Sequence, residues 1–170
     1  AMYGSDKPDL RCEMKIQDVS PVFGDSKFRV FRKVVSEGGV VRALVVPGAG
    51  RQARHKIDQI VDEAIEMGAS GLVWIRRSPE GEVQSSILKA AGVDSLTKTL
   101  EQVKAGPDDL TLLVAGSGSE ASSFLGRLRL TLARRYELLD ELRLEFLWVV
   151  DFPLLEWSEN ENRYVSKHHP

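Results

Sequence analysis

The sequence has a single cysteine, Cys12, and three histidines among its 170 residues. One cysteine excludes an internal disulfide and the thiolate-rich sites that hold zinc or iron–sulfur clusters. This fits a reducing compartment, so we expect a cytoplasmic protein. Long apolar runs are missing as well, since stretches such as residues 146–150 are far shorter than the roughly 20 residues of a membrane-spanning helix. The first residues show no apolar signal region, and we expect no membrane partner.

An excess of positive charge is also missing. The chain has 23 Lys and Arg residues against 25 Asp and Glu residues, a formal net charge of −2. Such a chain has no global positive field that attracts nucleic acid, so any RNA contact must come from a local patch. The length and the 42% hydrophobic content are enough for one core of ordinary size with flanking segments.

Three short apolar runs predict strands, and amphipathic segments between them predict helices. The strands are expected at Val40–Val46, residues 72–75 and residues 110–115, and the longest helices at residues 54–67 and 121–136. Shorter elements are expected as helices near residues 28–35, 87–91 and 96–103, strands at 14–19 and 146–150, and a hairpin of 154–157 with 163–166. Three central strands cannot complete a large parallel sheet, so we predict a two-layer α+β fold.

One short motif matches a cofactor fingerprint. Residues 116–121 (GSGSEA) fit the dinucleotide pattern G-x-G-x-x-A between an expected strand and helix. That pattern also needs an acid about 20 residues on, at the end of the next strand, to hold a ribose hydroxyl. Asp140 and Glu141 precede that strand and Asp151 comes too late. We therefore favour a Gly/Ser turn with Ser119 near the helix start.

Two other motifs have simple alternatives. Residues 47–51 (PGAGR) could form a backbone nest for phosphate, but they lack the lysine and hydroxyl of a P-loop, which favours a plain turn. His168 and His169 are adjacent, so on a strand they point to opposite sides and cannot easily hold one metal ion together. A site that adds Glu156 or Asp151 is the open alternative. We predict no metal site and no catalytic residue, and we interpret His55 as a surface residue.

Two groups of basic residues could neutralise RNA phosphates if they converge in space. Arg51, Arg54 and Lys56 lie near the start of one expected helix, whereas Arg127, Arg134 and Arg135 lie on the other. The alternative is an ordinary solvated surface, since many exposed helices carry such residues. The sequence leaves both interpretations open.

Both ends of the sequence resemble signature stretches of bacterial aspartyl-tRNA synthetases. Residues 3–11 read YGSDKPDLR, and residues 148–170 read WVVDFPLLEWSENENRYVSKHHP. Between them, the stretches GGVVRALVVPGAG, GASGLVWI and LGRLRLTLA resemble the GAD domain that is inserted into these synthetases. The resemblance covers essentially the whole chain. It implies an antiparallel sheet covered on one face by helices, in line with the α+β prediction.

The resemblance implies a GAD-type insertion domain at residues 25–143, with strips of the class II catalytic core at residues 1–24 and 144–170. Since both ends fall within core stretches, we expect a piece of a longer synthetase. We also expect the strands at residues 14–19 and 146–150 to be neighbours at the root of the insert.

The resemblance also implies a parent that activates L-aspartate with ATP and transfers it to tRNA. By resemblance, His168 binds the aspartate substrate, and His169 supports the same loop. The family's ATP-clamping arginines and metal-holding acids lie in motifs outside this chain. We therefore expect no cofactor and no catalysis here, although the parent uses ATP and Mg²⁺. Family members are homodimers through the missing core, so we expect this piece to be a monomer.

Two other functions are open at this point. The chain could be a noncatalytic GAD binding module of a tRNA-dependent amidotransferase, but the two flanks resemble synthetase sequence. An NAD(P)-linked oxidoreductase built on residues 116–121 would instead bind a dinucleotide.

Overall fold

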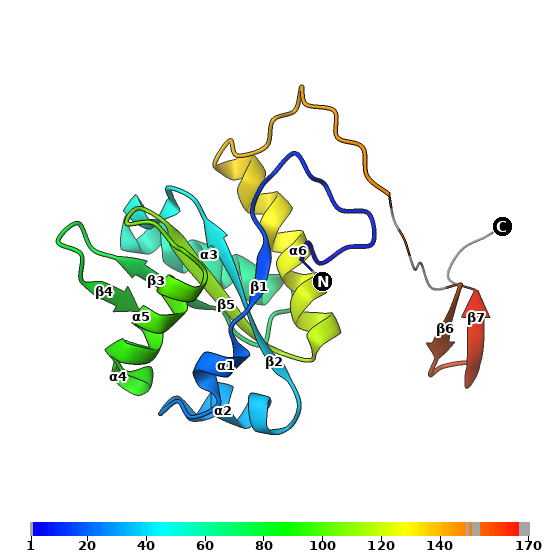
Figure 1. The fold of residues 1–170 in the computed structure, drawn as a ribbon, viewed down its shortest axis with the longest axis horizontal. Coiled ribbons are helices and arrows are strands. Elements are labelled where there is room, and N and C mark those ends of the chain that lie inside the picture. Colours follow the sequence, from blue (N-terminus) through cyan, green and yellow to red (C-terminus); the bar gives the residue numbers. More distant parts are fainter. Residues whose placement is uncertain (1, 149, 151–153, 167–170) are drawn as a thin grey trace.

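The computed structural model describes residues 2–148, 150 and 154–166. Figure 1 shows a main body of sheet and helices, with a small hairpin apart from it. The elements of the body are, in chain order, β1 (Ile16–Asp18), α1 (Ser20–Phe23), α2 (Arg29–Ser36), β2 (Val40–Val46), the 3₁₀ turn η1 (Ala49–Arg51), α3 (Arg54–Glu66), β3 (Val73–Arg77), β4 (Val83–Ser85), α4 (Leu88–Ala91), α5 (Val93–Gln102), β5 (Leu110–Gly116) and α6 (Gly118–Arg135). The hairpin is β6 (Leu155–Ser158) with β7 (Arg163–Ser166).

The main sheet has five strands in the order β1-β2-β5-β3-β4, and every neighbouring pair is antiparallel. Strands β2 and β5 pair along their whole length, from Val40 opposite Gly116 to Val46 opposite Leu110. The most apolar strands therefore form the centre of the sheet. The prediction of an α+β fold with a mainly antiparallel sheet and helices packed against it is confirmed.

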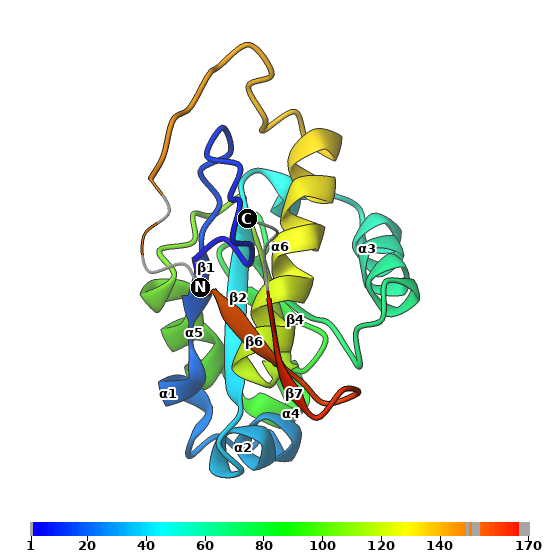
Figure 2. The same cartoon turned by 90° about the vertical axis from the view of Figure 1, so that its right-hand side faces the viewer.

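Helices cover both faces of this sheet, whereas the sequence led us to expect them on one face. Side chains alternate along β5, so that Leu112 packs in a core cluster with α3 and α6, while Leu113 packs in a second cluster with α1, α2 and α5. Figure 2 shows α1 and α5 on one side of β2, and α3 and α6 on the other. The physical reason is composition. A strand such as VVRALVV has apolar side chains on both faces, and burying them requires helices on both sides of the sheet.

The three central strands and the long helices lie within a few residues of their predicted positions. The hairpin of β6 and β7 is also present. The strand expected at residues 146–150 is wrong for the described residues, because 146–148 and 150 have no strand structure. Phe146 and Trp148 are about nine-tenths exposed, so they lack the partner that a strand requires. The expected neighbour of this stretch, β1, pairs instead with β2.

A buried arginine holds the amino-terminal segment against α6. The guanidinium of Arg129, which is 1% exposed, donates hydrogen bonds to the backbone carbonyls of Met14 (2.6 Å), Asp9 (2.7 Å) and Cys12. It also lies 5.0 Å from the ring centre of Tyr3. Residues 3–14 are thus part of the packed body. The domain boundary between residues 24 and 25 stays a prediction.

Two glycines let this segment approach α6 closely. A Cβ atom on Gly126 would lie 2.7 Å from the carbonyl oxygen of Gly4, and one on Gly4 would lie 1.9 Å from that of Ser122. Side chains larger than hydrogen are therefore excluded at this crossing.

Arg129→Met should lower the free energy of unfolding by roughly 2–4 kcal/mol, because buried carbonyls lose their charged donor. Urea denaturation followed by circular dichroism measures the change. Arg127→Met is the matched control, since Arg127 is exposed on the same helix and should change stability by less than about 0.5 kcal/mol. Equal effects of the two substitutions would contradict the role given to Arg129.

Candidate nucleic-acid interface

The two predicted basic groups lie on helices that pack side by side on one face of the sheet. The Arg135 guanidinium is 2.5 Å from the Glu63 carboxylate, and Arg127 donates a 3.5 Å hydrogen bond to the Met67 carbonyl. Residues 127 and 135 thus face the carboxyl-terminal half of α3, with the helices antiparallel. Since a helix rises about 1.5 Å per residue, Arg54 lies about 14 Å along α3 from Glu63. The groups share one layer but do not form one cluster.

Ion pairs divide these six exposed residues into two kinds. Arg51 pairs with Asp108 at 2.5 Å, and Arg54 pairs with Asp58 at 2.8 Å. Like the Arg135 pair, both pairs involve exposed or half-exposed groups, and such pairs are weak enough for a phosphate to replace the carboxylate. The other three, Lys56, Arg127 and Arg134, make no ion pair with any described residue and are directly available to an anion.

The sequence did not identify Arg76, which positions the first group. Its guanidinium donates to the backbone carbonyls of Gly50 (3.0 Å) and Gln52 (2.7 Å), and so fixes the turn that carries Arg51. Trp74 lies under this arrangement, with the guanidinium carbon of Arg54 4.5 Å from its ring centre. The only available signal was the alternation along β3, which places residues 74 and 76 on the same face.

The turn at residues 47–51 does not offer a nest of free amides. Its Gly48 N–H donates to the Asp109 carboxylate (3.1 Å), and its Gly50 N–H donates to the Asp108 carbonyl (2.8 Å). Internal acceptors thus occupy both amides and place a carboxylate where a phosphate would have to bind. The plain-turn interpretation is confirmed, and the phosphate-nest alternative is contradicted.

The glycine-rich stretch at residues 116–121 forms a helix cap. Ser117 is the N-cap of α6: its Oγ accepts from the Glu120 N–H (3.3 Å) and donates to the Glu120 carboxylate (2.6 Å). The cap is Ser117 and not Ser119. A carboxylate at this helix start would repel a pyrophosphate, and β5 is antiparallel to both of its neighbours, unlike a strand of a dinucleotide-binding fold. These features contradict the oxidoreductase alternative.

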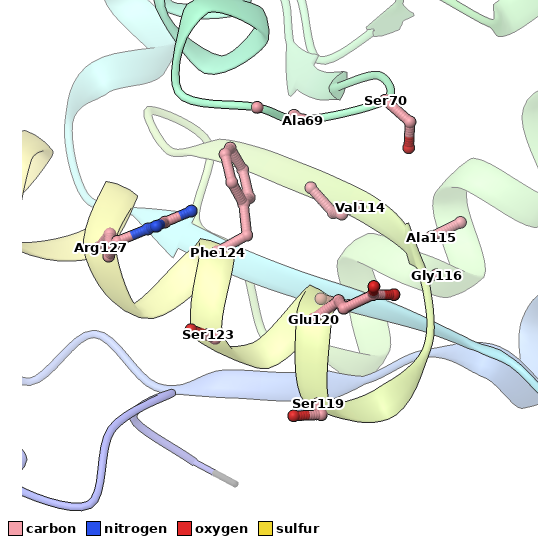
Figure 3. Close-up of a pocket in the computed structure, with 12 residues that line it drawn as sticks. Ala69, Ser70, Val114, Ala115, Gly116, Ser119, Glu120, Ser123, Phe124 and Arg127 are labelled. Atoms are coloured by element: carbon pink, nitrogen blue, oxygen red, sulfur yellow. The ribbon is translucent and has the colours of Figure 1, made fainter. Parts of the chain in front are cut away.

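A cavity of about 520 Å³ lies between α6, the end of β5 and the loop at residues 68–70. Figure 3 shows Val114 and Phe124 within it, with Arg127 and Glu120 at separate places on its border. Arg127 is the one residue of the predicted basic groups that borders it. The two opposite charges make this cavity no more attractive to an anion than the open surface.

The predicted aspartate-binding residues His168 and His169 lie outside the described residues, so their role stays a prediction. Asp151 also lies outside them, and the side chain of Glu156 is not described. Among the described residues, no group of three or more His, Cys, Asp or Glu side chains could hold a metal ion. His55 is exposed at the start of α3, as expected. Within the same part of the chain, no helix is both long and apolar enough to span a membrane.

The fold and its surface define a small α+β domain that carries exposed arginine and lysine side chains on α3 and α6. A family model described as "GAD domain" matches residues 31–125, which is more than half of the 170 residues. The chain therefore belongs to the GAD domain family.

Proteins similar to the chain extend this match to both flanks. One is "Aspartate--tRNA(Asp/Asn) ligase" of Caldanaerobacter subterraneus subsp. tengcongensis, 44% identical over 168 residues, which cover 99% of this chain and 28% of that protein. The protein of the same name from Aquifex aeolicus is 38% identical over 168 residues with the same coverage. "Aspartate--tRNA ligase" of Clostridium novyi is 41% identical over 169 residues, again with the same coverage. The chain thus spans just over a quarter of the length of these relatives.

The ion pair between Arg51 and Asp108 predicts how the stability of the fold depends on pH. The hydrogen bond from Arg51, opposed by partial desolvation, holds the pKa of Asp108 below its usual value of 3.8. A lowered folded-state pKa means that this pair stabilises the fold above pH 4 and that its contribution is lost as the pH falls through the pKa of Asp108. NMR titration of the Asp108 carboxyl carbon should give a midpoint below 3.8.

Arg51→Gln should return the midpoint to about 3.8, the ordinary value of an aspartate. Arg54→Gln is the control, because Arg54 pairs with Asp58 and should leave the Asp108 titration unchanged. An Asp108 midpoint that is the same in the wild type and in Arg51→Gln would show that the pair is not formed in solution.

Proposed function

We propose that the chain is the insertion domain of an aspartate–tRNA ligase, together with strips of the class II catalytic core at residues 1–24 and 144–170. One observation carries this proposal: similarity to the ligases runs over 168 residues and is not confined to the family match at 31–125. A domain shared among unrelated proteins would lose similarity at its edges. Here the flanks YGSDKPDLR and WVVDFPLLEW lie within the matched length.

The proposed activity of the whole ligase is activation of L-aspartate with ATP and transfer of the aspartyl group to tRNA. In this proposal His168 binds the aspartate, and His169 supports the same loop. A histidine suits this role because its ring can exchange hydrogen bonds with an ammonium or carboxylate group. The described residues do not fit an ATP–Mg²⁺ site, since no group of three or more His, Cys, Asp or Glu side chains among them could hold the metal ion. We therefore assign ATP and Mg²⁺ to the rest of the ligase.

The chain by itself is proposed to be an inactive monomer, whereas the whole ligase is a cytoplasmic homodimer. Its place in the ligase would be near the acceptor arm of the tRNA, where Lys56, Arg127 and Arg134 can each meet a phosphate. The net charge of −2 means that such contact would be local and sensitive to salt.

The sequence identity between this chain and its relatives does not depend on which tRNA the name of the relative specifies. The Clostridium novyi protein, named for aspartate tRNA without the Asp/Asn designation, is 41% identical, and proteins named for both tRNAs are 44% and 38% identical. We infer that the choice between the two tRNAs is made outside this domain. A GAD module of an amidotransferase, the second candidate, is disfavoured because the ligase similarity includes the flanks.

A chimeric ligase tests the activity. Replacing the matched residues of the Caldanaerobacter ligase with this chain should retain aspartate-dependent charging of tRNA, because both segments would supply the same core strips. In that chimera, His168→Ala should raise the KM for aspartate about tenfold or more, since the loss of one hydrogen bond to a charged group costs about 1.5–3 kcal/mol. A folded chimera without activity would contradict the proposal. His55→Ala, at an exposed site, is the control.

A separate experiment tests the contact with RNA. The 170-residue chain is expected to bind tRNA weakly at most, so low salt is used, and the triple variant Lys56→Gln, Arg127→Gln, Arg134→Gln should bind more weakly than the wild type. Fluorescence anisotropy of labelled tRNA measures both affinities. The control is the triple variant Lys7→Gln, Lys89→Gln, Lys98→Gln, which removes the same charge at exposed sites on other elements. If the wild type does not bind, the RNA role fails.

A further inference from the structure

The densest positive stretch of the sequence lies outside both predicted basic groups. Residues 27–33 (KFRVFRK) contain four cations and no acid, more cations than any other seven consecutive residues of the chain. This stretch forms the beginning of α2 and the residue pair before it. In a chain of net charge −2, such a concentration is a local exception.

The fold turns these cations outward. Successive helical residues are about 100° apart, so Arg29 and Lys33 lie opposite Phe31, and Arg32 lies beside them. Phe31 is 4% exposed and packs edge-on against the rings of Phe23 (5.0 Å) and Phe28 (4.9 Å). This aromatic packing fixes the rotation of α2 about its axis. The exposed basic face of α2 is therefore Arg29, Arg32 and Lys33, with Lys27 just before it.

The basic face has little internal compensation. Among the described residues, its one ion pair is Lys33 with Glu37 at 3.8 Å, between exposed side chains. Lys27, Arg29 and Arg32 make no ion pair with any described residue, in contrast to Arg51, Arg54 and Arg135. The first turn of α2 also has no acidic residue, although the helix dipole favours one there. The charges of Arg29 and Arg32, in the first turn, thus add nothing to the stability of the helix.

The chemistry of the face selects among anionic partners. A basic helix that binds a lipid surface inserts its apolar side into the bilayer. Here that side is already buried in the core, and Val30 is the exposed large apolar residue of the helix. Guanidinium groups bind phosphate oxygens through paired hydrogen bonds, and residues four apart lie about 5–6 Å from each other on a helix. Such spacing allows contacts with neighbouring phosphates of one strand.

We propose that the basic face of α2 is a second contact surface for the phosphate backbone of RNA, separate from the residues of α3 and α6. The identity of the partner rests on the proposed function, which supplies RNA as the polyanion. Helix α2 packs on the opposite face of the sheet from α3 and α6. Figures 1 and 2 place it near the amino-terminal end of α6. An RNA that reaches α2 thus meets the domain at a different side.

The test compares tRNA binding by the 170-residue chain and by the triple variant Arg29→Gln, Arg32→Gln, Lys33→Gln. Three lost phosphate contacts should weaken binding about tenfold or more at low salt and reduce the slope of log affinity against log salt by about 2–3. The Lys7→Gln, Lys89→Gln, Lys98→Gln variant is again the charge-matched control. Circular dichroism melts establish that all variants are folded, as expected for exposed substitutions.

The outcomes distinguish the α2 surface from the RNA role of the chain as a whole. A selective loss with the α2 variant, relative to the control, supports the proposal. If the wild type binds tRNA and the α2 variant behaves like the control, the α2 surface is overturned while the RNA role stands. If the wild type does not bind tRNA, both fail. Vesicles containing phosphatidylserine are the last comparison: an α2-dependent loss of vesicle binding with unchanged tRNA binding would overturn the proposal in favour of a lipid surface.

Discussion

The buried guanidinium of Arg129 is the interaction on which the arrangement of this chain depends. Burying a charge is costly unless its donors are satisfied, and here backbone carbonyls of residues 9, 12 and 14 satisfy them. These carbonyls belong to a segment without strand or helix structure. The same hydrogen bonds thus satisfy the buried guanidinium of Arg129 and the backbone carbonyls of the segment. As a result, residues that precede the family match at 31–125 are part of the same packed body.

Three other arginines make contacts that stabilise the fold. Arg76 donates to two backbone carbonyls and to Gln84, so it is committed to the turn before α3. Arg51 pairs with Asp108 across the same turn, and Arg135 ties α6 to α3 through Glu63. These arginines are thus engaged in contacts within the fold. Binding to an anion therefore falls to the cations that the fold does not use, such as Arg134 and the basic face of α2.

The sequence predicted the helices and strands that are determined by their own residues and not by contacts with distant ones. Strand β2 could be recognised because six of its seven residues are apolar, which favours a place in a buried sheet. The same run also implied burial on both faces, which the two-layer expectation did not use. Strand β4 was missed because its three residues, Val83–Ser85, become a strand only by pairing with β3.

The functional features were harder to predict because they depend on contacts between distant residues. The Gly48 amide meets Asp109 across 61 positions, and Arg129 meets Met14 across 115, which no periodicity can indicate. The Arg129 contacts hold the amino-terminal flank against α6, and the chain continues from this flank to the basic face of α2. The clamped segment leads directly into β1, α1 follows, and only residues 24–28 separate α1 from α2. Since Phe23 and Phe31 pack against each other, this link has little freedom. The amino-terminal flank and the basic face of α2 are therefore joined by packed elements, with only residues 24–28 between α1 and α2.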